Sequence, residues 1–345
     1  MQKGQLGQFY TTHYDYILSN MSIPDFVKKI IEPFVGSGDL LQFIKNKELY
    51  TIECYDIDPH YDKAIQQDTL LHPPSYENTF VLTNPPYLAR NKSKDKTLYD
   101  KYQCNDLYKC FLYSLIQDVC QGGIIILPLN FISSIRKADV ELRKQFLSIY
   151  SIQLVNIFEE RVFDDTSYAI CSMYFLNKSI DRNIEEDIQI HIYPSKNELT
   201  MKLNEVNNYT IGGEIYKLPM NSNYKIQRAT KTNQTNMTNI LLKCIDDSAT
   251  TMLGFQYVSD ENRFIDDTPK LSARSYATLL INTELTSDQQ KALVKNMNKY
   301  IKDQRMKYNS LFLTNYRDSN TIARKRISFD LAFKICNYVL TQSKL

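Results

Sequence analysis

Short apolar runs alternate with amphipathic stretches along the first half of the chain. Each run ends in small or acidic residues, and the stretch that follows carries apolar residues at helical spacing. This alternation is typical of strand and helix units in a parallel sheet. We expect strands within residues 30–31, 50–55, 80–83, 124–127, 152–158 and 169–176. The pattern predicts an α/β fold with a Rossmann-like, seven-stranded, doubly wound sheet.

Helical periodicity is clearest in three places. Residues 107–119 have apolar positions at helical spacing, and we expect Gly122 and Gly123 to stop that helix. A shorter helical pattern begins at Asp39. Residues 285–308 form a third pattern, in which Leu293, Met297, Tyr300 and Ile301 share one face.

The texture of the sequence changes after residue 195. Residues 204–239 are rich in Asn and Thr and contain few long apolar runs. A chain of 345 residues also exceeds what one hydrophobic core usually organises. We therefore predict two domains, comprising residues 1–195 and 196–345.

Composition narrows the class of protein. Hydrophobic residues make up 43% of the chain and charged residues 23%, and no stretch approaches the roughly 20 apolar residues that cross a bilayer. The N-terminus lacks the apolar core of a signal peptide. The seven cysteines lack the short paired spacing of a zinc site, so we expect reduced thiols and no metal. These features predict a cytoplasmic protein without a membrane partner.

Charge is unevenly divided between the two halves. The whole chain has 41 Lys and Arg and 39 Asp and Glu. Residues 1–200 carry 20 of these basic residues and 26 of the acidic ones, so residues 201–345 carry the remaining 21 basic and 13 acidic residues. The first part is acidic and the second basic, although the whole chain has a formal net charge of +2. A basic second part suggests a surface that faces a polyanion.

A glycine-containing segment, EPFVGSG at residues 32–38, lies between the first predicted strand and the helical pattern at Asp39. Glycines there permit a tight turn and leave room for a ligand at the carboxyl edge of the sheet. An ordinary strand-to-helix turn is the alternative. Position 41 is Leu, so the third glycine of a dinucleotide fingerprint is absent, which argues against NAD.

Acidic residues follow the second predicted strand. Asp56 stands where a carboxylate can accept both ribose hydroxyls of an adenosine. Asp58, which precedes Pro59, is better explained as a turn residue. Asp68 can receive an adenine amine or can cap a helix, and the sequence leaves both readings open.

The tetrapeptide Asn84-Pro85-Pro86-Tyr87 follows the third predicted strand. An adenine N6 nitrogen is a poor nucleophile because its lone pair is delocalised into the ring. The Asn84 side-chain oxygen and the Pro85 carbonyl can bind its two hydrogens and concentrate that lone pair, while the prolines fix the carbonyl's direction. Tyr87 offers a flat face for the base. A sulfonium methyl then needs only in-line approach and no strong base.

In this order, these motifs resemble the amino-methyltransferases of DNA, specifically the gamma class of adenine-N6 enzymes typified by the Taq methyltransferase. The resemblance covers roughly residues 4–180. It implies S-adenosylmethionine as cofactor and an N-terminal cofactor segment at residues 7–12, although Thr12 stands where the family commonly has proline. The cofactor-binding residues that it implies are Phe9, Thr11, Glu32, Pro33, Gly36, Gly38, Asp56, Ile57 and Asp68.

The same resemblance implies roles on the substrate side. Residues 84–87 match the catalytic motif in full, and residues 106–112 resemble the helix that follows it in the class. A second aromatic clamps the flipped base opposite the tyrosine, and our candidate is Phe163, with Tyr168 as the alternative. Phe163 can equally be a core residue.

Double-stranded DNA is the implied partner, and a cognate restriction endonuclease is left open. A base inside a duplex cannot reach the sheet edge, so the target adenine is expected to be flipped out. Arg317, Arg324, Lys325 and Arg326 form the densest basic cluster of the second half and are expected to lie on phosphates, unless they form a solvated helix face. Lys92, Lys94 and Lys96 form a polar loop whose role is open.

The sequence thus predicts a site-specific DNA adenine-N6 methyltransferase with a C-terminal target-recognition domain. Methylation of RNA adenine or of a protein glutamine by the same Asn-Pro-Pro-Tyr chemistry is the alternative. The glutamine enzymes place a helical substrate domain before the catalytic one, whereas here about 30 residues precede the glycine loop and a basic region follows. A catalytically inactive nucleic-acid-binding relative is the third reading.

Overall fold

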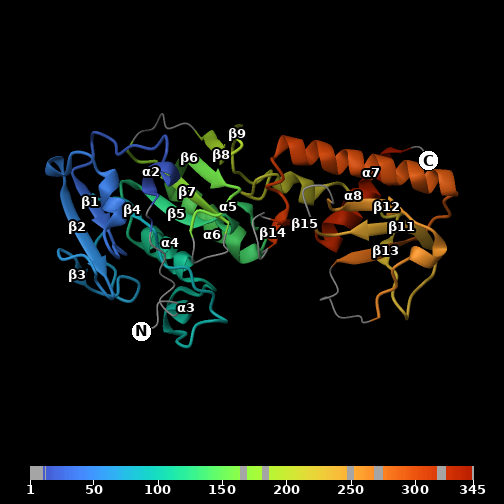
Figure 1. Ribbon diagram of the computed structural model, residues 1–345, viewed down its shortest axis with the longest axis horizontal. Helices are drawn as coiled ribbons and strands as arrows, with labels where there is room; N and C mark the ends of the chain where they lie inside the picture. The colour runs from blue at the N-terminus through green and yellow to red at the C-terminus, as the bar shows by residue number, and fades with distance from the viewer. Residues whose placement is uncertain are drawn as a thin grey trace. The chain divides into compact units, whose positions relative to one another are not determined.

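The computed structural model describes residues 11, 13–163, 169–180, 186–246, 252–267, 275–316 and 324–343. The chain divides into two compact units (Figure 1). The first unit extends to Asn204, and the second contains most of the residues from Glu205 onward.

A large mixed sheet forms the centre of the first unit. Within the described residues it has nine strands: β1 (Lys29–Glu32), β2 (Thr51–Asp56), β3 (Ile65–Gln66), β4 (Phe80–Thr83), β5 (Gly122–Pro128), β6 (Tyr150–Phe158), β7 (Ile170–Asn177), β8 (Ile188–Tyr193) and β9 (Asn197–Met201). Their spatial order is β3-β2-β1-β4-β5-β7-β6-β8-β9. Strands β1 to β5 are parallel, β7 is antiparallel to β5 and β6, and β9 is antiparallel to β8. The predicted α/β fold with a mostly parallel sheet is confirmed.

The central strands are built from continuous apolar runs because both of their faces are covered. All four residues of β4 and all seven of β5 are buried. Burial along the whole strand is typical of a parallel sheet that is covered on both faces. The carboxyl ends of β1, β2 and β4 meet at one edge, because the three strands are parallel neighbours. The glycine segment follows β1, Asp56 is the last residue of β2, and Asn84 follows β4.

Helices connect and cover the strands. Among the described residues, those of the first unit are α2 (Tyr14–Ile17), η1 (Asp39–Phe43), η2 (Lys47–Leu49), α3 (Thr97–Tyr102), α4 (Leu107–Gln117), α5 (Asn130–Ser133) and α6 (Lys137–Ile149). Figure 1 shows α4 and α6 beside the central strands, and the two helices contact each other. The predicted helix at residues 107–119 is confirmed as α4, but it ends at Gln117, and Gly122 and Gly123, which we expected to stop it, begin β5 instead. The pattern at Asp39 forms only the short 3-10 helix η1, because the backbone is already extended at Ile44.

The sheet has nine strands within the described residues and not the seven predicted. Strand β9 pairs with β8 from Ile188 and Met201 to Ile192 and Asn197, so the sheet continues past residue 195 and the first unit ends at Asn204. The sequence of β9, NELTM, alternates weakly and is mostly exposed or half-buried. Such an edge strand carries little of the apolar pattern by which strands are recognised.

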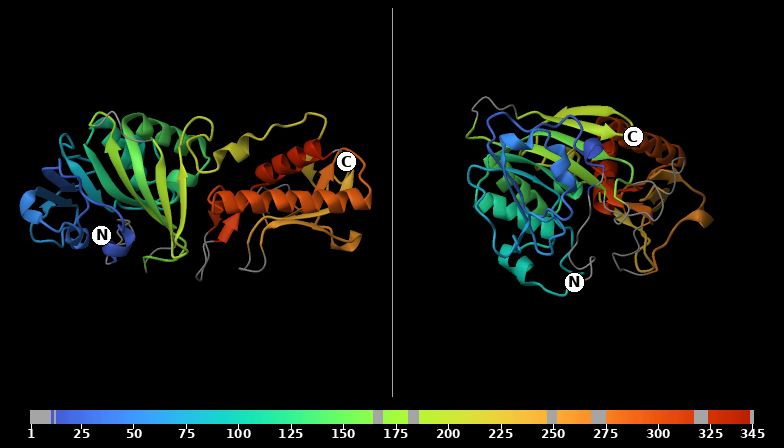
Figure 2. Two further views of the ribbon diagram at one scale, coloured as in Figure 1. Left: turned by 90° about the horizontal axis from the view of Figure 1, so that it is seen from above. Right: turned by 60° about the vertical axis from the view of Figure 1, so that its left-hand side comes forward.

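The second unit contains a four-stranded antiparallel sheet in the order β10-β13-β11-β12. Its elements are η3 (Gly213–Lys217), β10 (Ile226–Arg228), β11 (Met237–Lys243), β12 (Gly254–Tyr257), η4 (Asp260–Asn262), β13 (Tyr276–Ile281), α7 (Ser287–Lys307), β14 (Thr314–Tyr316), β15 (Arg324–Arg326) and α8 (Phe329–Gln342). Helix α7 contacts β11, β12 and α8 (Figure 2). It confirms the helix predicted at residues 285–308.

Candidate active site

The glycine segment turns sharply at the end of β1. Gly36 has φ of +53° and Gly38 has φ of +86°, a left-handed conformation that costs a side-chain-bearing residue about 1 kcal/mol or more. A Cβ on Gly38 would also lie 2.9 Å from the ring of Tyr61. The two glycines are therefore required by the backbone, as the sequence predicted for a tight turn.

Asp56 fastens this loop to the neighbouring strand. One carboxylate oxygen, Oδ2, accepts from the backbone N–H of Gly36 at 2.8 Å, and Oδ1 accepts from that of Asp58 at 2.9 Å. The side chain is buried, whereas Asp58 is exposed in the turn. This arrangement agrees with the interpretation of Asp58 as a turn residue.

Asp68 serves as a turn cap. Its Oδ1 accepts from the N–H groups of Leu70 and Leu71, both at 3.0 Å. The segment forms a hydrogen-bonded turn and not a helix. Asp68 also lines the pocket described next. The reading as a helix cap is therefore replaced by a turn cap, and the reading as an acceptor for the adenine amine stays a prediction.

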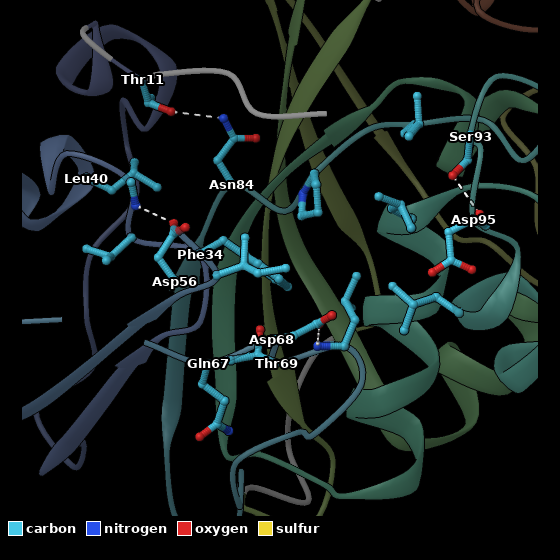
Figure 3. Close-up of a pocket in the computed structure, with 18 of the residues that line it drawn as sticks. Thr11, Phe34, Leu40, Asp56, Gln67, Asp68, Thr69, Asn84, Ser93 and Asp95 are labelled. Atoms are coloured by element: carbon cyan, nitrogen blue, oxygen red, sulfur yellow. Dashed lines mark hydrogen bonds between the residues drawn. The ribbon is translucent and has the colours of Figure 1, made fainter. Parts of the chain in front are cut away.

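One pocket gathers residues from all three motifs (Figure 3). The residues singled out from the sequence that line it are Thr11, Gly36, Asp56, Ile57, Asp68, Asn84 and Pro86. Of the others, Glu32, Pro33, Gly38, Pro85, Tyr87 and Phe163 do not line it, and Phe9 lies outside the described residues. The end of β1, the end of β2 and the end of β4 thus share a single cavity.

The pocket also has a wall that the sequence did not indicate. Leu88, Leu98 and Tyr99 come from the segment between β4 and α4, and Leu107 begins α4; all four supply apolar surface. Their only sequence signal is the helical pattern that begins at Leu107. The apolar wall makes the pocket suitable for a flat, partly apolar group such as a purine.

The amide of Asn84 is held by its neighbours. Its Nδ2 donates to Oγ1 of Thr11 at 3.1 Å (Figure 3), and Thr11 is itself buried. Its Oδ1 accepts from the hydroxyl of Tyr87. The two contacts restrict rotation of the amide and fix the direction of its oxygen.

Tyr87 does not lie where the sequence placed it. Its side chain is only 2% exposed, and its one hydroxyl proton is shared between Oδ1 of Asn84 and the Ile126 carbonyl oxygen, which lies 2.8 Å from the hydroxyl oxygen. The ring packs edge-on against Tyr108 with centroids 6.3 Å apart, and burial raises the pKa of the Tyr87 hydroxyl well above its ordinary value. The expectation of a flat face open to a base is therefore corrected for this conformation. Two buried acceptors for one hydroxyl explain the inward orientation.

Phe163 is 6% exposed. Its carbonyl accepts from Nε of Arg161 at 3.0 Å. The alternative clamp residue, Tyr168, lies outside the described residues. A role for either aromatic in holding a base stays a prediction.

Glu32 is the most perturbed acid beside the pocket. The side chain is 1% exposed, and Oε1 accepts from the hydroxyl of Thr83 at 2.5 Å. Among the described residues Oε2 has no hydrogen-bond partner. Burial raises the pKa of the carboxyl to about 8. Glu32 is therefore protonated near neutral pH in the folded chain.

This pKa predicts a pH-dependent stability. Because the pKa is raised on folding from 4.5 to about 8, the contribution is present below pH 4.5 and is lost as pH rises through 8. We expect the free energy of unfolding to fall by up to roughly 5 kcal/mol over that range. Denaturant titrations of wild type and Glu32→Gln should show a flatter profile for the variant. Glu48→Gln, at an exposed position, is the control, and identical profiles for Glu32→Gln and wild type would contradict the assignment.

The predicted basic cluster is a strand and not a helix face. Arg324–Arg326 forms β15, which pairs antiparallel with β14. Lys325 and Arg326 are half-buried. Arg317 and the side chain of Arg324 lie outside what the structure describes. In the first unit, the ammonium of Lys96 donates to the carbonyls of Arg90 and Ser93, which fastens part of the lysine loop.

The described residues contain neither a metal-binding cluster nor a membrane-spanning helix. No group of three or more His, Cys, Asp or Glu side chains is placed to hold a metal ion in this part of the chain. None of the helices that the structure describes is long and apolar enough to cross a membrane. All seven cysteines are free thiols, as predicted.

Comparison with solved structures finds similar folds at low identity. A type I restriction-modification methyltransferase subunit from Streptococcus thermophilus matches with a TM-score of 0.38 and 15% identity, covering 53% of this chain and 47% of that one. The M protein of the type I restriction enzyme EcoKI matches with a TM-score of 0.37 and 10% identity, and the match covers 84% of this chain and 68% of that one. The structure of the type IIL restriction-modification enzyme MmeI in complex with DNA matches with a TM-score of 0.38 and 13% identity. The match covers 63% of this chain and 40% of that one. This chain thus spans about half of the Streptococcus subunit. No protein-family model and no curated protein matches the sequence.

Proposed function

We propose that the chain is an S-adenosylmethionine-dependent DNA methyltransferase that acts on the N6 amine of a flipped-out adenine. The observation that carries the proposal is the shared pocket, which is lined by Gly36, Asp56 and Asn84. A cofactor loop and an amide acceptor in one cavity are what methyl transfer to an amine needs, because the reaction depends mainly on positioning.

The residues at the pocket fit the cofactor. Each carboxylate oxygen of Asp56 can accept more than one hydrogen bond, and the ribose hydroxyls would be further donors to it. Ile57 lines the pocket with a side chain that is 37% exposed, so it can cover an adenine ring. Asp68 would receive the adenine amine. When bound, S-adenosylmethionine supplies a methyl group already activated on a sulfonium.

The catalytic residues of the proposal are Asn84 and Pro85. An amide oxygen can accept two hydrogen bonds, and we propose that the target amine supplies one of them to Asn84. The Pro85 carbonyl would accept the second amine hydrogen. Thr11 orients the amide by accepting from Nδ2, and Pro86 lines the pocket next to it.

The inward orientation of Tyr87 suggests a test that separates its ring from its hydroxyl. If the hydroxyl positions Asn84, Tyr87→Phe should lower the methyl-transfer rate about tenfold, which corresponds to one neutral hydrogen bond. The dissociation constant for S-adenosylmethionine should stay unchanged. The control is Tyr150→Phe, which removes another buried hydroxyl, bonded to the Leu115 carbonyl at 2.7 Å. A Tyr87→Phe rate equal to wild type would assign the role to the ring instead.

The second unit is the proposed target-recognition domain. The chain is basic from residue 201 onward, as counted above, and Lys325 and Arg326 lie in β15 of this unit. Lysine and arginine side chains that contact phosphates fix the register of a protein on a duplex. A cognate restriction endonuclease remains a proposed partner.

Methyl transfer to competing substrates tests the proposal. The purified chain would be incubated with radiolabelled S-adenosylmethionine and either duplex DNA, structured RNA or a glutamine-containing protein substrate. We expect label in DNA alone. Label in RNA or in a glutamine amide would replace the proposed substrate class, and no label in any of them would favour an inactive binding module.

A further inference from the structure

Helix α7 has one face in the core of the second unit and the opposite face in solvent. Leu293, Met297 and Ile301 are buried, and the helix contacts β11, β12 and α8. Figure 2 shows α7 lying along the outside of this unit. Its N-terminus is fixed by a capping box between Thr286 and Gln289. The helix is therefore a rigid support for whatever its outer face presents.

That outer face carries a row of lysines. Lys291, Lys295, Lys299 and Lys302 are all exposed, and their spacings of four, four and three residues keep them within about a quarter of the helix circumference. With a rise of about 1.5 Å per residue, the row is about 16 Å long. We call these four residues the α7 lysine row.

Most of the α7 lysine row has no counter-charge. Only Lys291 forms a salt bridge among the described residues, with Asp288 at 3.5 Å. The exposed Asp303 lies one helical turn after Lys299 and is not within salt-bridge distance of it. Lys295, Lys299 and Lys302 form no salt bridge with any residue that the structure describes. Like charges one turn apart destabilise a helix by a few tenths of a kcal/mol per pair.

Several other cations of the same unit are paired. Arg305, at the end of the same helix, contacts Asp246 at 2.9 Å, and Arg228 contacts Asp266 at 2.6 Å. Lys334 contacts Asp330 at 3.2 Å. The α7 lysine row differs from these cations in that three of its four members have no carboxylate within salt-bridge distance among the described residues.

We propose that the α7 lysine row binds the phosphate backbone of duplex DNA, an inference that rests on the proposed function. A duplex carries one negative charge per about 1.7 Å of its axis, so a 16 Å row faces a dense line of phosphates. Lysine is a point charge on a flexible stem and lacks the planar fork that reads a base edge or grips one phosphate. The row therefore supplies sequence-independent affinity, separate from β15.

Charge-matched variants test the inference. In one variant all four lysines become glutamine, and in the other all four become arginine. Lysine, glutamine and arginine have similar helix propensities, so both variants should fold, which thermal melting would confirm. Binding of a fluorescent duplex would be measured by anisotropy over a series of salt concentrations. The slope of log affinity against log salt reports the number of phosphates neutralised.

We expect the glutamine variant to lose about one unit of slope for each lysine that contacts a phosphate, up to about four. The arginine variant should keep the wild-type slope. A glutamine variant with the wild-type slope would overturn the inference. So would a glutamine variant that binds DNA as the wild type does but no longer binds anionic vesicles.

The same proteins separate this inference from the proposed function. Asn84→Ala should bind DNA with the wild-type slope while failing to transfer methyl groups. The wild-type chain could bind DNA in a salt-dependent way that the glutamine variant loses, and yet transfer no methyl group. That result would support DNA binding by the α7 lysine row and contradict the proposed methyltransferase function. If the wild-type chain methylates DNA and the glutamine variant keeps the wild-type salt slope, the methyltransferase function would be supported and the role of the α7 lysine row contradicted.

Discussion

Replacing Asn84 with alanine is expected to lower the rate of methyl transfer by roughly 10²- to 10³-fold, the loss that follows removal of one preorganised group from a reaction site. The amide oxygen of Asn84 is the proposed acceptor for the target amine, and Thr11 and Tyr87 hold it in place. Alanine removes the acceptor and both contacts. Single-turnover rates with saturating cofactor would measure the loss.

Binding data give this prediction its control. The dissociation constant for S-adenosylmethionine, measured by calorimetry, should be nearly unchanged, because Asn84 acts on the substrate amine. Asn130→Ala, at an exposed asparagine of α5, should react at the wild-type rate. An Asn84→Ala protein that reacts as fast as wild type would remove Asn84 from the mechanism.

Replacing Asp56 with alanine is expected to raise the dissociation constant for S-adenosylmethionine by roughly 10²-fold or more. Hydrogen bonds to a charged group contribute about 1.5–3 kcal/mol each, and two ribose hydroxyls would be lost as donors. The variant also deprives Gly36 and Asp58 of the acceptor for their backbone N–H groups, so the glycine loop should loosen.

A neighbouring carboxylate provides the matched control for Asp56. Asp58→Ala removes an exposed carboxylate two residues away and should bind S-adenosylmethionine as wild type does. Asp56→Asn keeps one acceptor oxygen and should lie between the two. Equal affinities for Asp56→Ala and wild type would move the ribose site elsewhere in the pocket.

The sheet could be predicted where burial leaves a strong signal. β4 and β5 are buried along their whole length, so their apolar runs mark them in the sequence. β9 lies at the sheet edge, and its sequence NELTM has no buried position. The segment at Asp39 carries a helical pattern that the short link to β2 allows only as a 3-10 helix. Edge strands and short links depend on tertiary context that periodicity does not report.

The candidate site divides in the same way. Gly36, Asp56 and Asn84 could be placed together because they follow strands whose carboxyl ends share an edge. The inward orientation of Tyr87 could not, since it depends on the Ile126 carbonyl 39 residues away in the chain. The pairing of Arg324–Arg326 with β14 likewise depends on a distant strand, and a run of basic residues alone is equally compatible with a helix face.

Mass spectrometry of nucleosides, after reaction of the purified chain with unmethylated genomic DNA and S-adenosylmethionine, tests the proposed chemistry most directly. We expect N6-methyladenine to accumulate with the wild-type protein, to be confined to one short sequence when the product is read by single-molecule sequencing, and to form roughly 10²- to 10³-fold more slowly with Asn84→Ala. Methylated cytosine, or DNA that stays unmodified while the protein binds S-adenosylmethionine, would contradict it.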